Sequence, residues 1–170
     1  LIDALAAYDL KDLTLCGHSM GGLIALDMVL NHNFAAKELI LVNSIYPTRV
    51  ADALLAKAKM GNGGAANFII KYGLYRRLLG MRNAFSEADD LVMLDDLDAC
   101  NNYELDLNDI KNVEIPISII LGSKDRLVDL KAVENFTDIV PSQTYTMDEV
   151  GHFSFFEDPV ELSRLISTIV

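Results

Sequence analysis

The sequence predicts an α/β protein in which helices cover both faces of a parallel sheet. Three observations lead to this prediction. Short runs of strand-forming residues alternate with longer segments in which apolar residues recur at the three-to-four spacing of a helix. Glycine, proline or asparagine bounds these runs, as is typical of buried strands. With 51% apolar residues in 170, the chain can also fill the core of one domain.

The first part of the chain supplies two of the predicted strands. Residues 1–10 have the apolar spacing of one helical face. Residues 13–16 form a short apolar run that Gly17 ends, and residues 21–31 return to helical spacing. A second buried strand is predicted at residues 39–42. The local order is therefore helix, strand, sharp turn, helix, strand.

The last part of the chain supplies the other two strands. A third strand is predicted at residues 117–121, where Pro116 stands at the start and so costs no ladder hydrogen bond. A helix at residues 130–140 leads to a fourth strand at residues 143–147, and an amphipathic helix at residues 159–170 ends the chain. About four parallel strands flanked by helices are therefore expected.

Between residues 49 and 112 the pattern becomes helical only. Helical segments are predicted at residues 52–59, 66–79 and 88–98. The glycine-rich residues 61–64 separate the first two segments. A phosphate-binding loop would need a preceding strand and a following Lys-Ser/Thr, and neither is present, so a flexible hinge between helices is favoured.

Composition excludes several classes of protein. The chain has 14 Lys and Arg against 25 Asp and Glu, a formal net charge of −11, which argues against a nucleic-acid binder. The most apolar helical segment, residues 23–30, is too short to span a membrane. Cys16 and Cys100 have neither disulfide nor metal-ligand spacing, and Cys16 is expected to be a small buried hydrophobe.

The most informative segment is Gly17-His18-Ser19-Met20-Gly21, which lies between a predicted strand and a predicted helix. A serine on such a tight turn is held in a strained conformation, and glycines two residues before and after it let strand and helix approach closely. The serine hydroxyl then projects above the sheet edge as a nucleophile. The helix N-terminus lies beneath it, so the Met20 N–H is expected to donate to an oxyanion.

A nucleophilic serine needs a general base within hydrogen-bond reach. His152 follows the fourth strand, at the sheet edge where functional sites of α/β proteins collect, and it is the expected base. His18 is expected to point away from the attacking side of Ser19 and to brace the turn. His32 lies at a helix end and is expected to be solvated.

The base must be oriented by an acceptor, usually a carboxylate. Asp125 stands just past the third strand and is the expected acid. Asp129 is the nearest competitor, but it falls where a helix begins and suits an N-cap. After the second strand, the corresponding positions hold Asn43 and Ser44, with no carboxylate.

These motifs together resemble a known family. Residues 17–22, 122–128 and 151–152 are similar to the nucleophile elbow, acid turn and histidine loop of the α/β-hydrolase superfamily. Residues 108–125 resemble the return from a helical cap into the sheet in the proline iminopeptidase, esterase and C–C hydrolase branches. The resemblance implies a hydrolase core at residues 1–51 and 109–170 and a helical cap insertion at residues 52–108.

The resemblance also implies that the chain is the C-terminal portion of such a hydrolase. Family members have further strands and a second oxyanion donor before the elbow, so about 80–100 residues are expected to be missing. The elbow strand of the fragment would then have an unpaired, aggregation-prone side. We expect a cytoplasmic location, and a secreted one stays open because a lost signal peptide would not be visible.

The expected function is that of a serine hydrolase acting on a small-molecule acyl substrate. Ser19, Asp125 and His152 would form an acyl-enzyme, with a carboxylic ester as the favoured substrate and no metal or organic cofactor. Prolyl aminopeptidase, C–C bond hydrolase and thioesterase activities stay open, as do a non-catalytic ligand-binding protein and an inactive fragment. Acidic residues of the cap could bind a free amino terminus, although a solvated helix face is favoured: Asp89, Asp90, Asp95, Asp96 and Asp98. The oligomeric state stays open.

Overall fold

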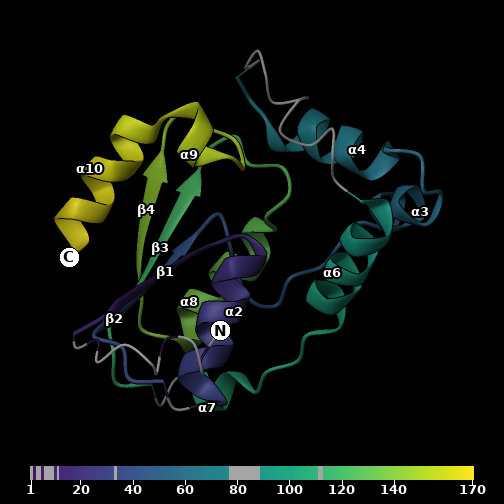
Figure 1. Ribbon diagram of the computed structural model, residues 1–170. Coiled ribbons are helices and arrows are strands. Elements are labelled where there is room, and N and C mark those ends of the chain that lie inside the picture. The colour runs from purple at the N-terminus through teal and green to yellow at the C-terminus, as the bar shows by residue number, and fades with distance from the viewer. Residues whose placement is uncertain are drawn as a thin grey trace.

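The centre of the molecule is a four-stranded parallel sheet with the strand order β1-β2-β3-β4 (Figure 1). The computed structural model describes residues 2, 5, 10, 12–32, 34–76, 89–110 and 113–170. The strands are β1 (Thr14–His18), β2 (Glu38–Val42), β3 (Ile117–Gly122) and β4 (Gln143–Met147). Because the strands are parallel, their carboxyl ends meet at one edge of the sheet.

Helices cover both faces of this sheet, as the alternation of apolar side chains along β2 requires. Leu39 and Leu41 point to the face that holds α2 and α8, where Phe136 is fully buried. Ile40 and Val42 point to the opposite face and pack in one cluster with Leu162 and Leu165 of the last helix. The helices are α2 (Met20–Leu30), α8 (Leu130–Ile139) and α10 (Pro159–Ile169). The predicted α/β class is confirmed.

Three further helices lie beside the sheet and form an apolar cluster of their own (Figure 1). They are α3 (Asp52–Lys59), α4 (Gly64–Gly73) and α6 (Asp90–Asn102). Leu54, Ala58 and Ala65 are the buried members of this cluster. The two short helices are α7 (Leu107–Ile110) and α9 (Ser154–Glu157). The segment that was predicted as a helical insertion therefore contributes helices, and no strand, within the part of the chain that is described.

Some predicted element ends were wrong. β1 continues past Gly17 because that residue pairs with Leu41 in the ladder, and His18 pairs with Val42. α4 begins at Gly64, inside the expected hinge, because the left-handed turn is already complete at Gly63, with φ 73°. Residues 77–79 of the same predicted helix lie outside the described residues, as does almost all of the predicted helix at 1–10.

The expectation that Cys16 is buried was also wrong, because its side chain is exposed. Cys16 pairs with Ile40 and therefore shares its face of the sheet. The apolar cluster that α10 forms on this face includes Ile40 but no residue of β1, which is the edge strand among the described residues. In the same part of the chain, no helix has both the length and the apolar character that a membrane crossing needs.

Candidate active site

Ser19 lies in the turn between β1 and α2, in a backbone conformation that residues with a side chain rarely adopt. Its φ is 51° and its ψ is −122°, the strained geometry expected of a nucleophile elbow. Three hydrogen bonds hold it there. Its N–H donates to the Val42 carbonyl at 3.0 Å, and its own carbonyl accepts from Ser44 Oγ at 2.7 Å and from the Gly22 N–H at 2.9 Å. The strain is therefore supported by the neighbouring strand β2.

Glycine is sterically required at one position before the serine and one after it, but not at every glycine position of the motif. A Cβ at position 17 would collide with the backbone of Gly21, and a Cβ at Gly22 would collide with the side chain of Ser44. A Cβ at Gly21 would meet only open space. The tight approach of β1 to α2 therefore depends on Gly17 and Gly22. Gly21 tolerates a side chain sterically, although it belongs to the motif.

Asp125 lies in the turn after β3 and accepts four hydrogen bonds. Its Oδ1 accepts from the backbone N–H groups of Leu127 at 2.8 Å and Val128 at 3.2 Å. Its Oδ2 accepts from the side chains of Asn43 at 2.9 Å and His152 at 2.8 Å. A carboxylate offers about four acceptor sites, so these partners saturate and fix it.

His152 is held by a loop that packs against the acid turn and against α4. Its backbone N–H donates to the Gly73 carbonyl at 2.6 Å, and the Lys124 N–H donates to the Val150 carbonyl at 2.8 Å. The preceding N–H, of Gly151, donates to the buried carboxylate of Glu157 at 3.1 Å. The histidine loop is therefore tied to the sheet, to α4 and to α9.

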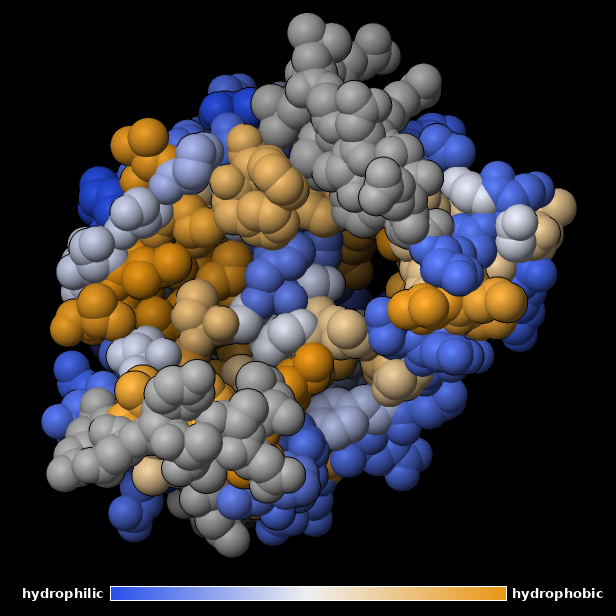
Figure 2. All heavy atoms as spheres, viewed as in Figure 1, coloured by the Kyte–Doolittle hydropathy of each residue, from blue (hydrophilic) through white to orange (hydrophobic). Residues whose placement is uncertain are grey.

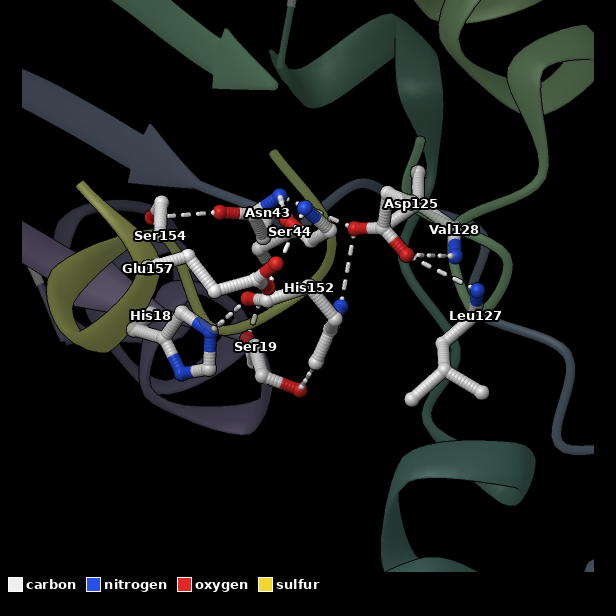
Figure 3. A network of polar contacts seen from close by, with 11 residues as sticks. His18, Ser19, Asn43, Ser44, Asp125, Leu127, Val128, His152, Ser154 and Glu157 are labelled. Carbon is white, nitrogen blue, oxygen red and sulfur yellow. Dashed lines mark hydrogen bonds and ion pairs between the residues drawn. The ribbon is translucent and has the colours of Figure 1, made fainter. Parts of the chain in front are cut away.

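In the structure, Ser19, His152 and Asp125 are joined by a continuous chain of hydrogen bonds (Figure 3). His152 Nε2 lies 3.0 Å from Ser19 Oγ, and His152 Nδ1 lies 2.8 Å from Asp125 Oδ2. A carboxylate only accepts, so Nδ1 carries the proton and Nε2 is free to accept from the serine hydroxyl. The side chain of His152 is 7% exposed and that of Asp125 is 1% exposed, so bulk water barely screens this contact.

The charge of Asp125 follows from its partners. Burial alone would raise the pKa of this carboxyl, but the hydrogen bond and charge of His152, the Leu127 N–H and Asn43 outweigh burial and lower it below its ordinary value. Asp125 is therefore ionised at neutral pH, and its negative charge lies beside His152 Nδ1.

Asn43 is a site residue that the sequence reasoning missed. It is fully buried, at a φ of 46°, and its Nδ2 donates both to Asp125 Oδ2 and to the Gly151 carbonyl, the latter at 3.2 Å. Its Oδ1 accepts from Ser154 Oγ at 2.7 Å. One amide therefore joins the acid turn, the histidine loop and α9. The available signal was its position directly after a buried strand, where a carboxylate had been sought.

His18 braces the histidine loop, but its ring does not point away from the attacking side of Ser19, as was expected. Its Nε2 donates to the His152 carbonyl at 2.7 Å, and its ring also lines the pocket beside Ser19. The ring packs edge-on against Phe155, with centroids 4.8 Å apart. Burial lowers the pKa of His18 to about 4, so this side chain is neutral at neutral pH.

We expect His18 to make the stability of the protein depend on pH between about 6.5 and 4. The unfolded chain binds a proton at an ordinary histidine pKa of about 6.5, whereas the folded chain does so only at about 4. As the pH is lowered through this window, the free energy of unfolding should therefore decrease by up to about 3 kcal/mol. Urea unfolding at several pH values checks this: His18→Gln, which keeps a donor, should give a flatter profile.

The same series contains its control. His32→Gln removes a histidine at an exposed position of the α2 end and accounts for losing a histidine as such. The stabilisation from Asp125 is lost only at lower pH, as its depressed folded pKa is passed, so the two effects separate. A His18→Gln profile as steep as that of the wild type would contradict the expectation.

A pocket of about 570 Å³ opens above Ser19, between the sheet edge and helices α3, α4 and α6. Figure 2 shows a hollow between these three helices and the rest of the molecule. Most of the lining is apolar, including Ile45, Leu54 and Phe153. Met20 also lines the pocket, and its N–H is the first of α2, so it has no acceptor within the helix. This N–H is available to an oxyanion beside Ser19.

The other candidate residues are placed outside this line of contacts. Asp129 caps α8 by accepting from the Lys131 N–H at 2.9 Å, as an N-cap should. His32 is exposed, and its Nε2 lies 3.3 Å from Asp27. The acidic residues considered for binding an amino terminus do not line the described pocket: Asp89, Asp90, Asp95, Asp96 and Asp98.

Comparisons with known proteins identify the family and the fold of the chain. The pimeloyl-[acyl-carrier protein] methyl ester esterase of Aromatoleum aromaticum is 25% identical over 99% of this chain and 78% of that protein. Two solved structures are similar over 99% of this chain. The esterase EaEST from Exiguobacterium antarcticum has a TM-score of 0.86 and 19% identity, with 70% of that chain covered. A lipase-esterase related protein from Clostridium acetobutylicum has a TM-score of 0.80 and 22% identity, with 74% of that chain covered. The model of the alpha/beta hydrolase family matches residues 1–165. The chain therefore belongs to the alpha/beta hydrolase family.

Proposed function

We propose that the protein is a serine hydrolase that cleaves carboxylic esters of small molecules. The observation that carries this proposal is the chain of hydrogen bonds from Ser19 through His152 to the ionised Asp125, with 3.0 Å and 2.8 Å between the joined atoms. A serine hydroxyl is a weak nucleophile unless an adjacent base takes its proton. Here the base is within reach and its tautomer is fixed.

The reaction proceeds in two steps. Ser19 Oγ attacks the ester carbonyl carbon while His152 Nε2 takes the hydroxyl proton, and the resulting imidazolium is stabilised by Asp125. The same proton passes to the leaving alcohol as the carbon–oxygen bond breaks. His152 then activates a water molecule, which hydrolyses the acyl-enzyme. The Met20 N–H donates to the oxyanion in both steps.

The choice of esters over the alternative reactions rests on the pocket and on the relatives. A mainly apolar lining suits an acyl chain, and among the described residues it includes none of the five cap aspartates considered for binding the amino terminus of a peptide. An esterase is the function named for the similar protein of Aromatoleum aromaticum. Helices α3, α4 and α6 act in this proposal as the cap that closes the pocket above Ser19.

A substrate panel with active-site labelling tests the proposal. We expect the protein to hydrolyse p-nitrophenyl butyrate, and to do so far faster than proline p-nitroanilide or a vinylogous 1,5-diketone. A fluorophosphonate should add one mass increment, located by peptide mapping on Ser19. A folded protein that neither cleaves any ester nor takes up the label would refute the function.

A further inference from the structure

The pocket above Ser19 is mainly apolar, but two arginines enter its lining. Arg49 comes from the segment between β2 and α3, and Arg126 directly follows Asp125 in the acid turn. Both side chains are exposed to solvent at this pocket. The only other charged side chain in the lining, within the described residues, is that of Asp129.

Neither arginine is used to hold the fold together by an ion pair. Within the part of the chain that is described, no carboxylate pairs with Arg49 or Arg126, although other arginines of the protein do form such pairs. Asp129 is engaged as the N-cap of α8 through the Lys131 N–H. Two arginines against one aspartate therefore leave the described lining with a net positive charge, and neither arginine forms an ion pair within the described residues.

Arg126 is also positioned. Its guanidinium carbon lies 5.7 Å from the centre of the Tyr72 ring, a cation–π distance, and Tyr72 itself lines the pocket. Tyr72 belongs to α4, so this contact connects the acid turn to the helices above the pocket. A guanidinium held over an aromatic ring keeps the edge that carries its N–H donors free for an acceptor.

Two cations at the pocket stand out against the charge of the whole chain, which is −11. A chain of this net charge repels anions on average. At the pocket, apolar walls of low polarity focus the field of the arginines and strengthen their attraction for an anion. Arginine also matches the planar, two-oxygen geometry of carboxylate and phosphate groups.

We propose that the pocket selects esters that carry a carboxylate away from the bond that is cleaved. Arg126 and Arg49 bind that group, while the apolar lining holds the carbon skeleton between it and Ser19. This inference rests on the proposed ester hydrolysis, because it concerns the substrate of the same site. The anionic group lies either on the acyl side or on the alcohol side of the ester.

Matched substrate pairs distinguish these two sides. On the acyl side, mono-p-nitrophenyl adipate is compared with p-nitrophenyl hexanoate, which has the same chain length and no charge. On the alcohol side, 4-carboxyphenyl butyrate is compared with 4-carbamoylphenyl butyrate. For each pair, the ratio of kcat/KM for the anionic ester to kcat/KM for the neutral ester is measured in the wild type and in Arg126→Gln, Arg49→Gln and the double variant.

We expect the double variant to lower this ratio about tenfold in at least one pair, mainly through KM, because charge-assisted hydrogen bonds are lost. The pair that responds identifies the side of the ester. Raising the salt concentration should lower the wild-type ratio in the same pair. Lys37→Gln removes one positive charge, as each single arginine variant does, in the loop before β2 and away from the described pocket lining, and should leave the ratio unchanged.

Each outcome decides one question. Ratios that stay at the wild-type value in both pairs for the double variant overturn the anion site, even though the esters are cleaved and ester hydrolysis stands. If the wild type cleaves none of the four esters, the proposed function itself fails. Circular dichroism of each variant confirms that a lowered ratio does not come from loss of the fold.

Discussion

A Ser19→Ala protein is expected to lose roughly 10⁴–10⁶-fold in kcat on esters and all labelling by a fluorophosphonate. The nucleophile is removed, and the remaining Met20 N–H and the pocket can stabilise only a direct attack by water. Alanine keeps the Cβ of serine, so the strained backbone at φ 51° is unchanged. Stopped assays of p-nitrophenyl butyrate hydrolysis and mass spectrometry after labelling measure both effects.

The control for this variant is Ser163→Ala, which makes the same change at an exposed position of α10. It should keep the activity and the label. Urea unfolding of Ser19→Ala should give a stability close to that of the wild type, because the described contact of Ser19 Oγ is a single hydrogen bond to His152 Nε2, which contributes about 1 kcal/mol. Retained labelling of Ser19→Ala would remove Ser19 from the nucleophile role.

Local patterns predicted most of the fold. The spacing of apolar residues gave the four strands and the helices between them, and the strand predicted at 143–147 coincides with β4. The errors arise where contacts with residues distant in the sequence decide the outcome. Gly17 reads as a strand breaker in isolation, but it lies in the ladder opposite Leu41. Cys16 is predicted to be buried because its neighbours are apolar, but it is exposed on the edge strand, outside the apolar cluster that α10 forms.

The candidate site was predictable where a residue type is required by the chemistry. Ser19, Asp125 and His152 each follow a strand, and the structure brings them within hydrogen-bond distance. Residues that act through others carried no such signal. Asn43 acts by joining Asp125 to Ser154, two partners far away in the sequence. The side of the turn on which His18 lies depends on the histidine loop that accepts its hydrogen bond.

Replacing Asp125 by Asn is expected to lower kcat about 10³–10⁴-fold, although only one atom of the side chain changes. The backbone N–H groups of Leu127 and Val128 demand an oxygen at the Oδ1 position, so the amide nitrogen must take the place of Oδ2. There it faces His152 Nδ1 at about the distance that the wild type has, 2.8 Å. An amide N–H can only donate, so the proton of His152 moves to Nε2.

The loss of activity follows from this change of tautomer. An imidazole with its proton on Nε2 cannot accept the Ser19 hydroxyl proton, and no negative charge then stabilises the imidazolium. The amide nitrogen also faces the Asn43 Nδ2 donor, so stability should fall as well. Asp129→Asn is the matched control, because asparagine caps helices about as well as aspartate, and its effect on kcat should be far smaller. Equal losses in the two variants would mean that Asp125 is not the acid that orients His152.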